Sequence, residues 1–214
     1  YVEVFGGSGA LLFAKPPSRT EVYNDVNGDL VNVFRCLKYH EGEMRRELAL
    51  LLNSREEFAA AIAQPGLTDI QRAARWWWRH KVGFGGVCSK PGNVGFTASG
   101  LAGPCGMGSS RSNMQAKINR LSARLDRVQI ERLDWRELLA KYDRPATVFF
   151  IDPPYDTTAK EYGIGFSNAD RADLKTRLNA LRGWWIATLP DELWAWEWAE
   201  GRPVEVYERP LTRN

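Results

Sequence analysis

Val148-Phe149-Phe150-Ile151 is an uninterrupted apolar run that leads directly into Asp152-Pro153-Pro154-Tyr155. An apolar run of this length, stopped by prolines, predicts a strand buried on both faces of a parallel sheet. In open α/β sheets, ligands bind outside the carboxyl ends of the strands. The tetrapeptide follows the carboxyl end of the predicted strand, so Asp152, Pro153, Pro154 and Tyr155 are the candidate catalytic residues.

The tetrapeptide combines rigid hydrogen-bond acceptors with an aromatic face. Two successive prolines fix φ and lack N–H groups, so the Asp152 carboxylate and the carbonyl near Pro153 are held stiffly. Two such acceptors could bind the N–H groups of a purine's exocyclic amine and localise its lone pair. Tyr155 could stack on a base rotated out of a duplex. The alternative is a structural Pro-Pro turn in which Asp152 only caps the chain.

Further apolar runs separated by helical patterns extend this picture to the whole chain. Strands are predicted at residues 2–5, 21–24, 147–151 and 184–189, with a fifth candidate at 128–133. Helical periodicity predicts one or two helices over 41–63, a buried stripe of Ile118, Leu121, Leu125 and Val128, and a helix carrying Leu174, Leu178 and Leu181 after a cap at Ser167. Strands that alternate with helices predict an α/β fold, a mostly parallel sheet with helices on both faces.

A glycine-rich turn follows the first predicted strand. Phe5-Gly6-Gly7-Ser8-Gly9 precedes the helical pattern of residues 10–13, and Asp25 lies at the end of the next strand. Glycines at a strand-to-helix turn let the backbone approach a ligand, and a carboxylate about twenty residues later can accept ribose hydroxyls. No Gly-Lys-Ser/Thr follows, so the turn is not a P-loop. The pair favours an adenosine-containing ligand.

The middle of the chain differs from the rest in charge and composition. Residues 66–132 contain eleven Lys or Arg and three Asp or Glu, whereas the remaining residues are net acidic. Nine of the twenty-six residues in 83–108 are glycine, which predicts a loop. We therefore expect residues 54–126 to be a mostly helical insertion that binds DNA, between the two parts (1–53 and 127–214) of a catalytic domain. A basic insertion is what binding to phosphates requires.

Basic side chains recur at helical spacing within the insertion. The candidate DNA-binding residues are Arg72, Arg75, Arg79, Lys90, Arg111, Lys117, Arg120 and Arg124. The alternative is a solvated basic surface with arginines lying over apolar neighbours. For Trp76, Trp77 and Trp78 a core position is favoured over contact with bases. The five tryptophans between 184 and 198 are also interpreted as packing residues.

Composition excludes several other classes of protein. No apolar stretch approaches the roughly 20 residues of a membrane span, and residues 1–5 lack the basic start of a signal peptide. Cys36, Cys88 and Cys105 are an odd number without CxxC spacing, which predicts reduced thiols and no zinc site. We expect a cytoplasmic, DNA-associated monomer that needs no metal or membrane.

Phe5-Gly6-Gly7-Ser8-Gly9, Asn24-Asp25 and Asp152-Pro153-Pro154-Tyr155, in this order around a long insertion, resemble the motifs of the Dam-type (α-group) N6-adenine DNA methyltransferases. Residues 72–86 are similar to the family's target-recognition region, and Leu133-Asp134-Trp135 resembles a further motif. The resemblance implies a Rossmann-like sheet that uses S-adenosylmethionine to methylate adenine N6 in duplex DNA, in a phage or prophage-like member, with or without a restriction partner.

The resemblance also assigns roles to residues of this chain. The implied cofactor-binding residues are Phe5, Gly7, Gly9, Asp25, Asp134 and Asp152, with Asp25 on the ribose hydroxyls and Asp134 near the cofactor's adenine. Asp152 would face both the cofactor's amino-acid part and the target amine, beside Pro153 and Tyr155. Only the resemblance to the family suggests GATC as the DNA sequence that is recognised.

Two departures from the family pattern keep alternatives open. Val4 replaces the family's usual proline, and the family's upstream motif, an aromatic residue and a Lys that contact the methionine part of the cofactor, has no counterpart before Glu3. Either the sequence is truncated or cofactor binding is impaired. The alternatives are an rRNA methyltransferase acting on adenine N6 or guanine N2, and a DNA-binding protein without catalysis. A cytosine-N4 enzyme is disfavoured, because Ser usually replaces Asp152 there.

Overall fold

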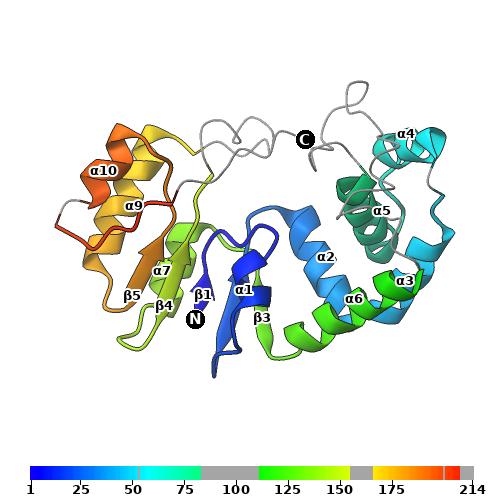
Figure 1. The fold of residues 1–214 in the computed structure, drawn as a ribbon, viewed down its shortest axis with the longest axis horizontal. Coiled ribbons are helices and arrows are strands. Elements are labelled where there is room, and N and C mark those ends of the chain that lie inside the picture. The colour runs from blue at the N-terminus through cyan, green and yellow to red at the C-terminus, as the bar shows by residue number, and fades with distance from the viewer. Residues whose placement is uncertain (53, 83–110, 155–165, 200, 208–214) are drawn as a thin grey trace.

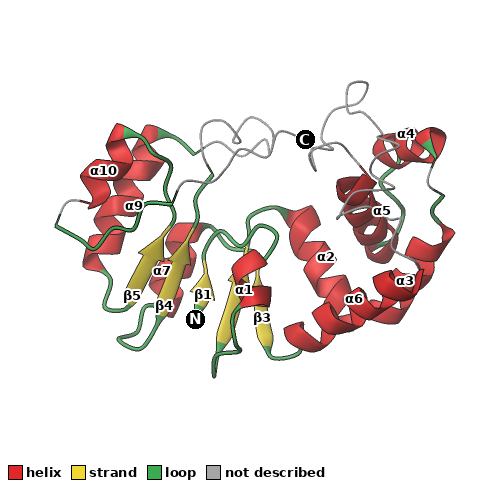
Figure 2. Cartoon of the chain, viewed as in Figure 1, coloured by secondary structure: helices red, strands yellow, loops and turns green. Residues whose placement is uncertain are grey.

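A computed structural model describes residues 1–52, 54–82, 111–154, 166–199 and 201–207. Within these residues five strands form one parallel sheet in the order β3-β2-β1-β4-β5. The strands are β1 (Val2–Glu3), β2 (Glu21–Asn24), β3 (Val128–Glu131), β4 (Val148–Ile151) and β5 (Trp184–Ala187). All arrowheads point toward the same edge of the sheet (Figure 2). The predicted α/β class and parallel sheet are confirmed.

All five predicted strands are present, and four of them are shorter than predicted. The run over 2–5 ends at Glu3, the run over 128–133 at Glu131 and the run over 184–189 at Ala187, while β4 begins one residue late, at Val148. The apolar pattern continues past each of the three strand ends because those residues pack inside the protein. Phe5, Leu133 and Leu189, for example, lie against the same apolar cluster.

Helices cover both faces of the sheet, because successive strand residues point to opposite sides. On one face, Tyr23 packs with Leu12 of α1 (Ala10–Ala14) and Phe34 of α2 (Gly28–Tyr39). On the other face, Val22 and Phe149 pack with α7 (Trp135–Tyr142), α9 (Asn168–Ala180) and α10 (Leu193–Ala199). Figure 1 shows α9 and α10 beside β5, and α2 at the opposite end of the sheet.

A group of helices extends the core beyond the sheet on the side of α2. It comprises α3 (Glu41–Leu50), α4 (Arg55–Ala63), α5 (Asp69–Val82) and α6 (Arg111–Leu125). The predicted helical region 41–63 is two helices, since the chain breaks after Leu50 and Ser54 caps α4 by accepting the Glu57 amide at 3.0 Å. Trp78 is fully buried here, as predicted, and Trp76 and Trp77 pack against the same core.

The buried stripe predicted from Ile118 to Val128 is confirmed only in part. Ile118 and Leu125 are buried in α6, but the helix ends at Leu125, and Val128 is the first residue of β3. The buried side chains of α4, α5 and α6 belong to the same cluster as those of α2 and α3. The division into a catalytic domain and an inserted domain over 54–126 stays a prediction.

The expected cap of α9 is confirmed as a reciprocal capping box. The Ser167 hydroxyl accepts the Asp170 amide at 3.2 Å, and the Asp170 carboxylate accepts the Ser167 amide at 2.8 Å. The packing role predicted for the late tryptophans is wrong for two of them. Trp198 is buried, but Trp184 is 72% exposed and Trp196 48% exposed.

None of the helices described here has both the length and the apolar character to cross a membrane.

Candidate active site

The carboxyl ends of β1 and β4 adjoin in the middle of the sheet. The chain builds β2 and β3 on one side of β1 and then crosses to build β4 and β5 on the other. Crevices at such switch points are where open α/β sheets bind ligands. Glu3 is in register with Phe150, and the Val4 amide donates to the Phe150 carbonyl at 3.1 Å. Continued by two residues, this register puts Phe5 beside Asp152.

The turn after β1 is tied down by the end of β2. The Gly6 amide donates to the Asn24 carbonyl at 2.7 Å, and the Tyr23 hydroxyl donates to the Gly7 carbonyl at 2.6 Å. A Cβ at Gly6 would lie 2.3 Å from the Tyr23 ring, so only glycine allows this approach. The turn that the sequence predicted to bind a ligand is therefore held in one conformation by its hydrogen bonds to β2.

The next two glycines of interest adopt left-handed backbone conformations. Gly7 has φ 50° and Gly9 has φ 66°, a region that glycine enters without steric cost. A Cβ at Gly9 would meet the Phe13 ring at 3.0 Å, whereas a Cβ at Gly7 would meet nothing within 4 Å. The open side of Gly7 leaves room for a ligand to approach the backbone.

Asp25 lies beside this turn and shares its hydrogen bonds. Its Oδ2 accepts the Gly7 amide at 2.9 Å, and its Oδ1 accepts the Asn27 amide at 2.8 Å. Burial raises the pKa of Asp25 above its ordinary value, while the two amide bonds oppose the rise. A carboxylate oxygen can accept a second bond, so Asp25 can still receive a hydroxyl donor.

Asp134 lies at the carboxyl side of β3, on the same edge as the turn. It caps α7 by accepting the Arg136 amide at 2.8 Å, and its side chain is 54% exposed. Arg136 also binds Asp170 and Asp173, which joins the starts of α7 and α9. The exposed carboxylate of Asp134 is thus held at this edge by its capping bond, and its role near the cofactor's adenine stays a prediction.

Two aromatic rings pack against Phe5, a contact that the sequence did not predict. The Phe5 ring lies edge-on to Phe166 at 5.7 Å and is tilted against Trp135 at 6.4 Å between centroids. Trp135 and Phe166 are both buried. The position of Trp135 directly after Asp134 could have indicated its contact with Phe5 from the sequence. The approach of Phe166 could not be predicted in this way, because it depends on the packing of α9.

Asn24 has a structural role at the site that the sequence did not predict. Its buried amide nitrogen donates to the Val4 carbonyl at 2.9 Å and to the Leu133 carbonyl at 3.2 Å, and its oxygen accepts the Leu133 amide at 2.8 Å. One side chain therefore joins the carboxyl ends of three adjacent strands. The position of Asn24 beside Asp25, at the end of a predicted strand, is the feature of the sequence that could have indicated this role.

The Asp152 segment opens onto the same edge. Asp152 is exposed, Pro153 is buried and Pro154 is half-buried, while Tyr155 lies outside the described residues. The Thr188 hydroxyl donates to Asp152 Oδ1 at 2.6 Å. The carboxylate thus lies outside the strand ends, with the glycine turn on the neighbouring strand.

Residues 1–187 match the family model described as D12 class N6 adenine-specific DNA methyltransferase. The chain belongs to this family. It therefore methylates adenine in DNA with S-adenosylmethionine as the methyl donor. The comparison with curated proteins found no match.

The glycine turn and its neighbours fit the cofactor that this D12 class methyltransferase uses. The open side of Gly7, the carboxylate of Asp25 and the aromatic surroundings of Phe5 offer a backbone approach, a hydroxyl acceptor and apolar contact. These are the groups that an adenosine moiety needs. S-adenosylmethionine supplies an activated methyl group when it is bound.

The DNA-binding candidates of this methyltransferase differ in their surroundings. Lys117 and Arg120 are exposed on α6, and Arg72, Arg75 and Arg79 are partly buried on α5. Arg75 donates to the Gln64 carbonyl at 2.6 Å and Arg72 pairs with Asp69. Lys90 and the side chain of Arg111 lie outside the described residues.

Arg124 requires a correction. Its guanidinium binds the buried Glu21 carboxylate and donates to the Leu12 carbonyl at 2.8 Å, and its side chain is 16% exposed. Its partners are internal because they lie in β2 (Glu21) and α1 (Leu12). We therefore leave it out of the DNA-binding residues.

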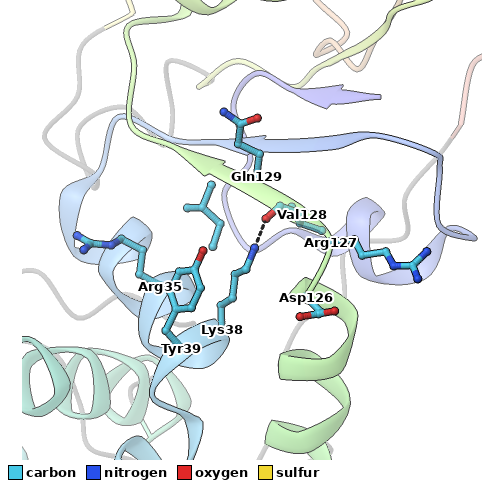
Figure 3. A pocket seen from close by; sticks show the side chains of 8 residues that line it. Arg35, Lys38, Tyr39, Asp126, Arg127, Val128 and Gln129 are labelled. Atoms are coloured by element: carbon cyan, nitrogen blue, oxygen red, sulfur yellow. Dashed lines mark hydrogen bonds between the residues drawn. The ribbon is translucent and has the colours of Figure 1, made fainter.

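A hollow lies at the start of β3, and Figure 3 shows side chains that line it. It is lined by Arg35, Lys38, Tyr39 and residues 126–130. Lys38 donates to the Val128 carbonyl at 2.7 Å across it. Because β3 begins here, the hollow lies at the amino ends of the strands, away from Asp152.

Proposed function

We propose that this methyltransferase modifies the N6 amine of an adenine within a specific sequence of duplex DNA, after the base has rotated out of the helix. The observation that carries the proposal is the register between β1 and β4, which sets the glycine turn beside Asp152 at the switch point of the sheet. A methyl donor on the turn and an amine at Asp152 would then be neighbours.

The proposed catalytic residues act on the adenine amine by hydrogen bonding and charge. The Asp152 carboxylate accepts one N–H of the amine, and the carbonyl of Pro153 accepts the other. These bonds draw the nitrogen lone pair out of conjugation with the ring. On accepting a methyl group the nitrogen would gain positive charge, which the Asp152 carboxylate would stabilise until one N–H proton is released to solvent. Pro154 keeps the segment rigid, and Tyr155 stacks on the extruded base.

The proposed cofactor-binding residues orient the donor. Phe5, Gly7 and Gly9 line its site, Asp25 accepts the ribose hydroxyls, Asp134 lies near its adenine, and Asp152 also faces its amino-acid part. A hydrogen bond joins Asp25 to the Gly7 amide, which holds this carboxylate beside the glycine turn. Preorganisation of this kind favours alignment of donor and acceptor.

DNA would be held by basic side chains of α5, α6 and the segment between them. The exposed Lys117 and Arg120 are suited to phosphate contact, and Arg72, Arg75, Arg79, Lys90 and Arg111 complete the proposed set. Neutralised phosphates supply affinity that does not depend on sequence.

The direct test incubates the protein with methyl-labelled S-adenosylmethionine and either duplex DNA or rRNA, followed by sequencing of the modified sites. We expect label at adenine N6 in DNA, in one recurring sequence. Label in rRNA alone, or at cytosine, would contradict the proposal. DNA binding without transfer, together with no heat of cofactor binding in calorimetry, would indicate a binding protein instead.

A further inference from the structure

We infer that Thr188 is a positioning residue that sets the orientation of the Asp152 carboxylate; the inference rests on the catalytic role proposed for Asp152. Thr188 directly follows β5, as Asp152 directly follows β4. Ile151 and Ala187 are in register, and the Thr188 amide donates to the Ile151 carbonyl at 2.9 Å. The two side chains therefore emerge next to each other from paired strands.

The contact between them is a short hydrogen bond to a charged group. Thr188 Oγ1 lies 2.6 Å from Asp152 Oδ1, within the range of a hydroxyl bound to a carboxylate. An ionised carboxylate has no proton, so Thr188 is the donor. The backbone bond to Ile151 fixes the main chain of Thr188, so that the sheet itself presents the hydroxyl.

This bond restricts the rotation of the carboxylate about its final torsion. The final torsion of an Asp side chain is broad, because rotation about a bond to an sp² carbon is weakly restricted. Both side chains are exposed. The Thr188 donor at Oδ1 holds one carboxylate oxygen at a defined position, and a defined carboxylate plane is what an aligned bond to an amine requires. Thr188 would thus act on the methyl-transfer step rather than on DNA affinity.

The test compares Thr188→Val, which keeps the shape and loses the hydroxyl, with Thr188→Ser, which keeps the hydroxyl. Thr176→Val is the matched control, because the Thr176 hydroxyl donates to the Ala172 carbonyl on the exposed side of α9. We expect kcat of Thr188→Val to fall about tenfold, as misalignment at a reacting group does. KM for DNA should stay near the wild-type value, Thr188→Ser should recover most of kcat, and the control should equal wild type.

A second measurement needs neither DNA nor the cofactor. Carbon-13 labelling of the aspartate carboxyl groups gives one NMR signal for each Asp. The signal of Asp152 is the one that disappears in Asp152→Asn. We expect Thr188→Val to move that signal, and Thr176→Val to leave it in place. A wild-type protein that methylates no DNA would contradict the proposed function, while the carboxyl signal still decides the role of Thr188. An unmoved signal, wild-type kcat in Thr188→Val, or no recovery in Thr188→Ser would overturn the inference.

Discussion

The guanidinium of Arg124 forms a salt bridge with the carboxylate of Glu21, which links the last turn of α6 to the first residue of β2. Two nitrogens of Arg124 bind the two carboxylate oxygens, at 2.5 and 2.9 Å. One of these nitrogens also donates to Leu12 in α1, the helix that begins after the glycine turn. An arginine that the sequence suggested for DNA binding is therefore an internal link between α6 and the cofactor side of the sheet.

Arg124→Ala should destabilise the protein, because it leaves Glu21 buried with one of its charged partners gone. Loss of one member of a buried ion pair costs about 3 kcal/mol in free energy of unfolding. Urea denaturation measures the change. Arg120→Ala is the control on the same helix, where the side chain is exposed and a change within about 0.5 kcal/mol is expected. Equal effects of the two substitutions would contradict an internal role for Arg124.

Acid should weaken the fold through the same carboxylate. Burial alone would raise the pKa of Glu21, but hydrogen bonds from Arg124, Lys15 and the Ser18 amide lower it to about 2. A lowered pKa contributes stability that is present above the ordinary Glu pKa of about 4.5 and is lost as pH falls toward 2. We expect at most about 3 kcal/mol to disappear over this window. Glu21→Gln, followed by denaturation at each pH, should show a shallower loss than wild type.

Asp152→Ala should abolish methyl transfer while DNA binding persists, because affinity for DNA comes mainly from phosphate contacts. A filter assay of labelled methyl groups and a gel-shift titration measure the two properties. Asp126→Asn, at an exposed Asp in the separate hollow at β3, should retain both. Near-wild-type transfer by Asp152→Ala would exclude the proposed catalytic residue.

Gly7→Ala and Gly9→Ala should separate cofactor binding from stability. Each places a side chain on a left-handed backbone, at a cost of about 1 kcal/mol. At Gly9 the new Cβ also presses on the rings of Phe13 and Phe34, so the loss of stability should be larger. At Gly7 it enters the open side of the turn, so calorimetry should show a cofactor Kd raised about tenfold. Unchanged affinity in Gly7→Ala would argue against a cofactor at this turn.

Arg120→Ala should weaken DNA binding at every sequence and reduce its dependence on salt. One lost phosphate contact lowers the slope of log K against log salt by about 0.9. Titrations at several salt concentrations measure that slope. Arg182→Ala is the control, since Arg182 is exposed beside the amino end of β5. The same slope in Arg120→Ala and wild type would remove this residue from the DNA surface.

The local chemistry of the site could be predicted from short stretches of the chain. The apolar run before Asp152 gave the strand and the edge, and the glycines after Phe5 gave the turn, since left-handed backbone and close approach restrict which residues can occupy a position. The cap at Ser167 was equally local. The order of the strands across the sheet was not predicted, because it depends on which apolar faces pack together.

The amino-acid sequence alone determined the parallel α/β class, the strand-end motifs and the family to which they belong. Each of these depends on residues that are only a few positions apart. Only the tertiary structure decided that Arg124 faces Glu21 across 103 positions, that Asn24 joins three strands, and that Thr188 meets Asp152 across 36 positions. The physical reason is that a polar side chain has many available partners in the sequence. Packing of the helices and register of the strands select one of them.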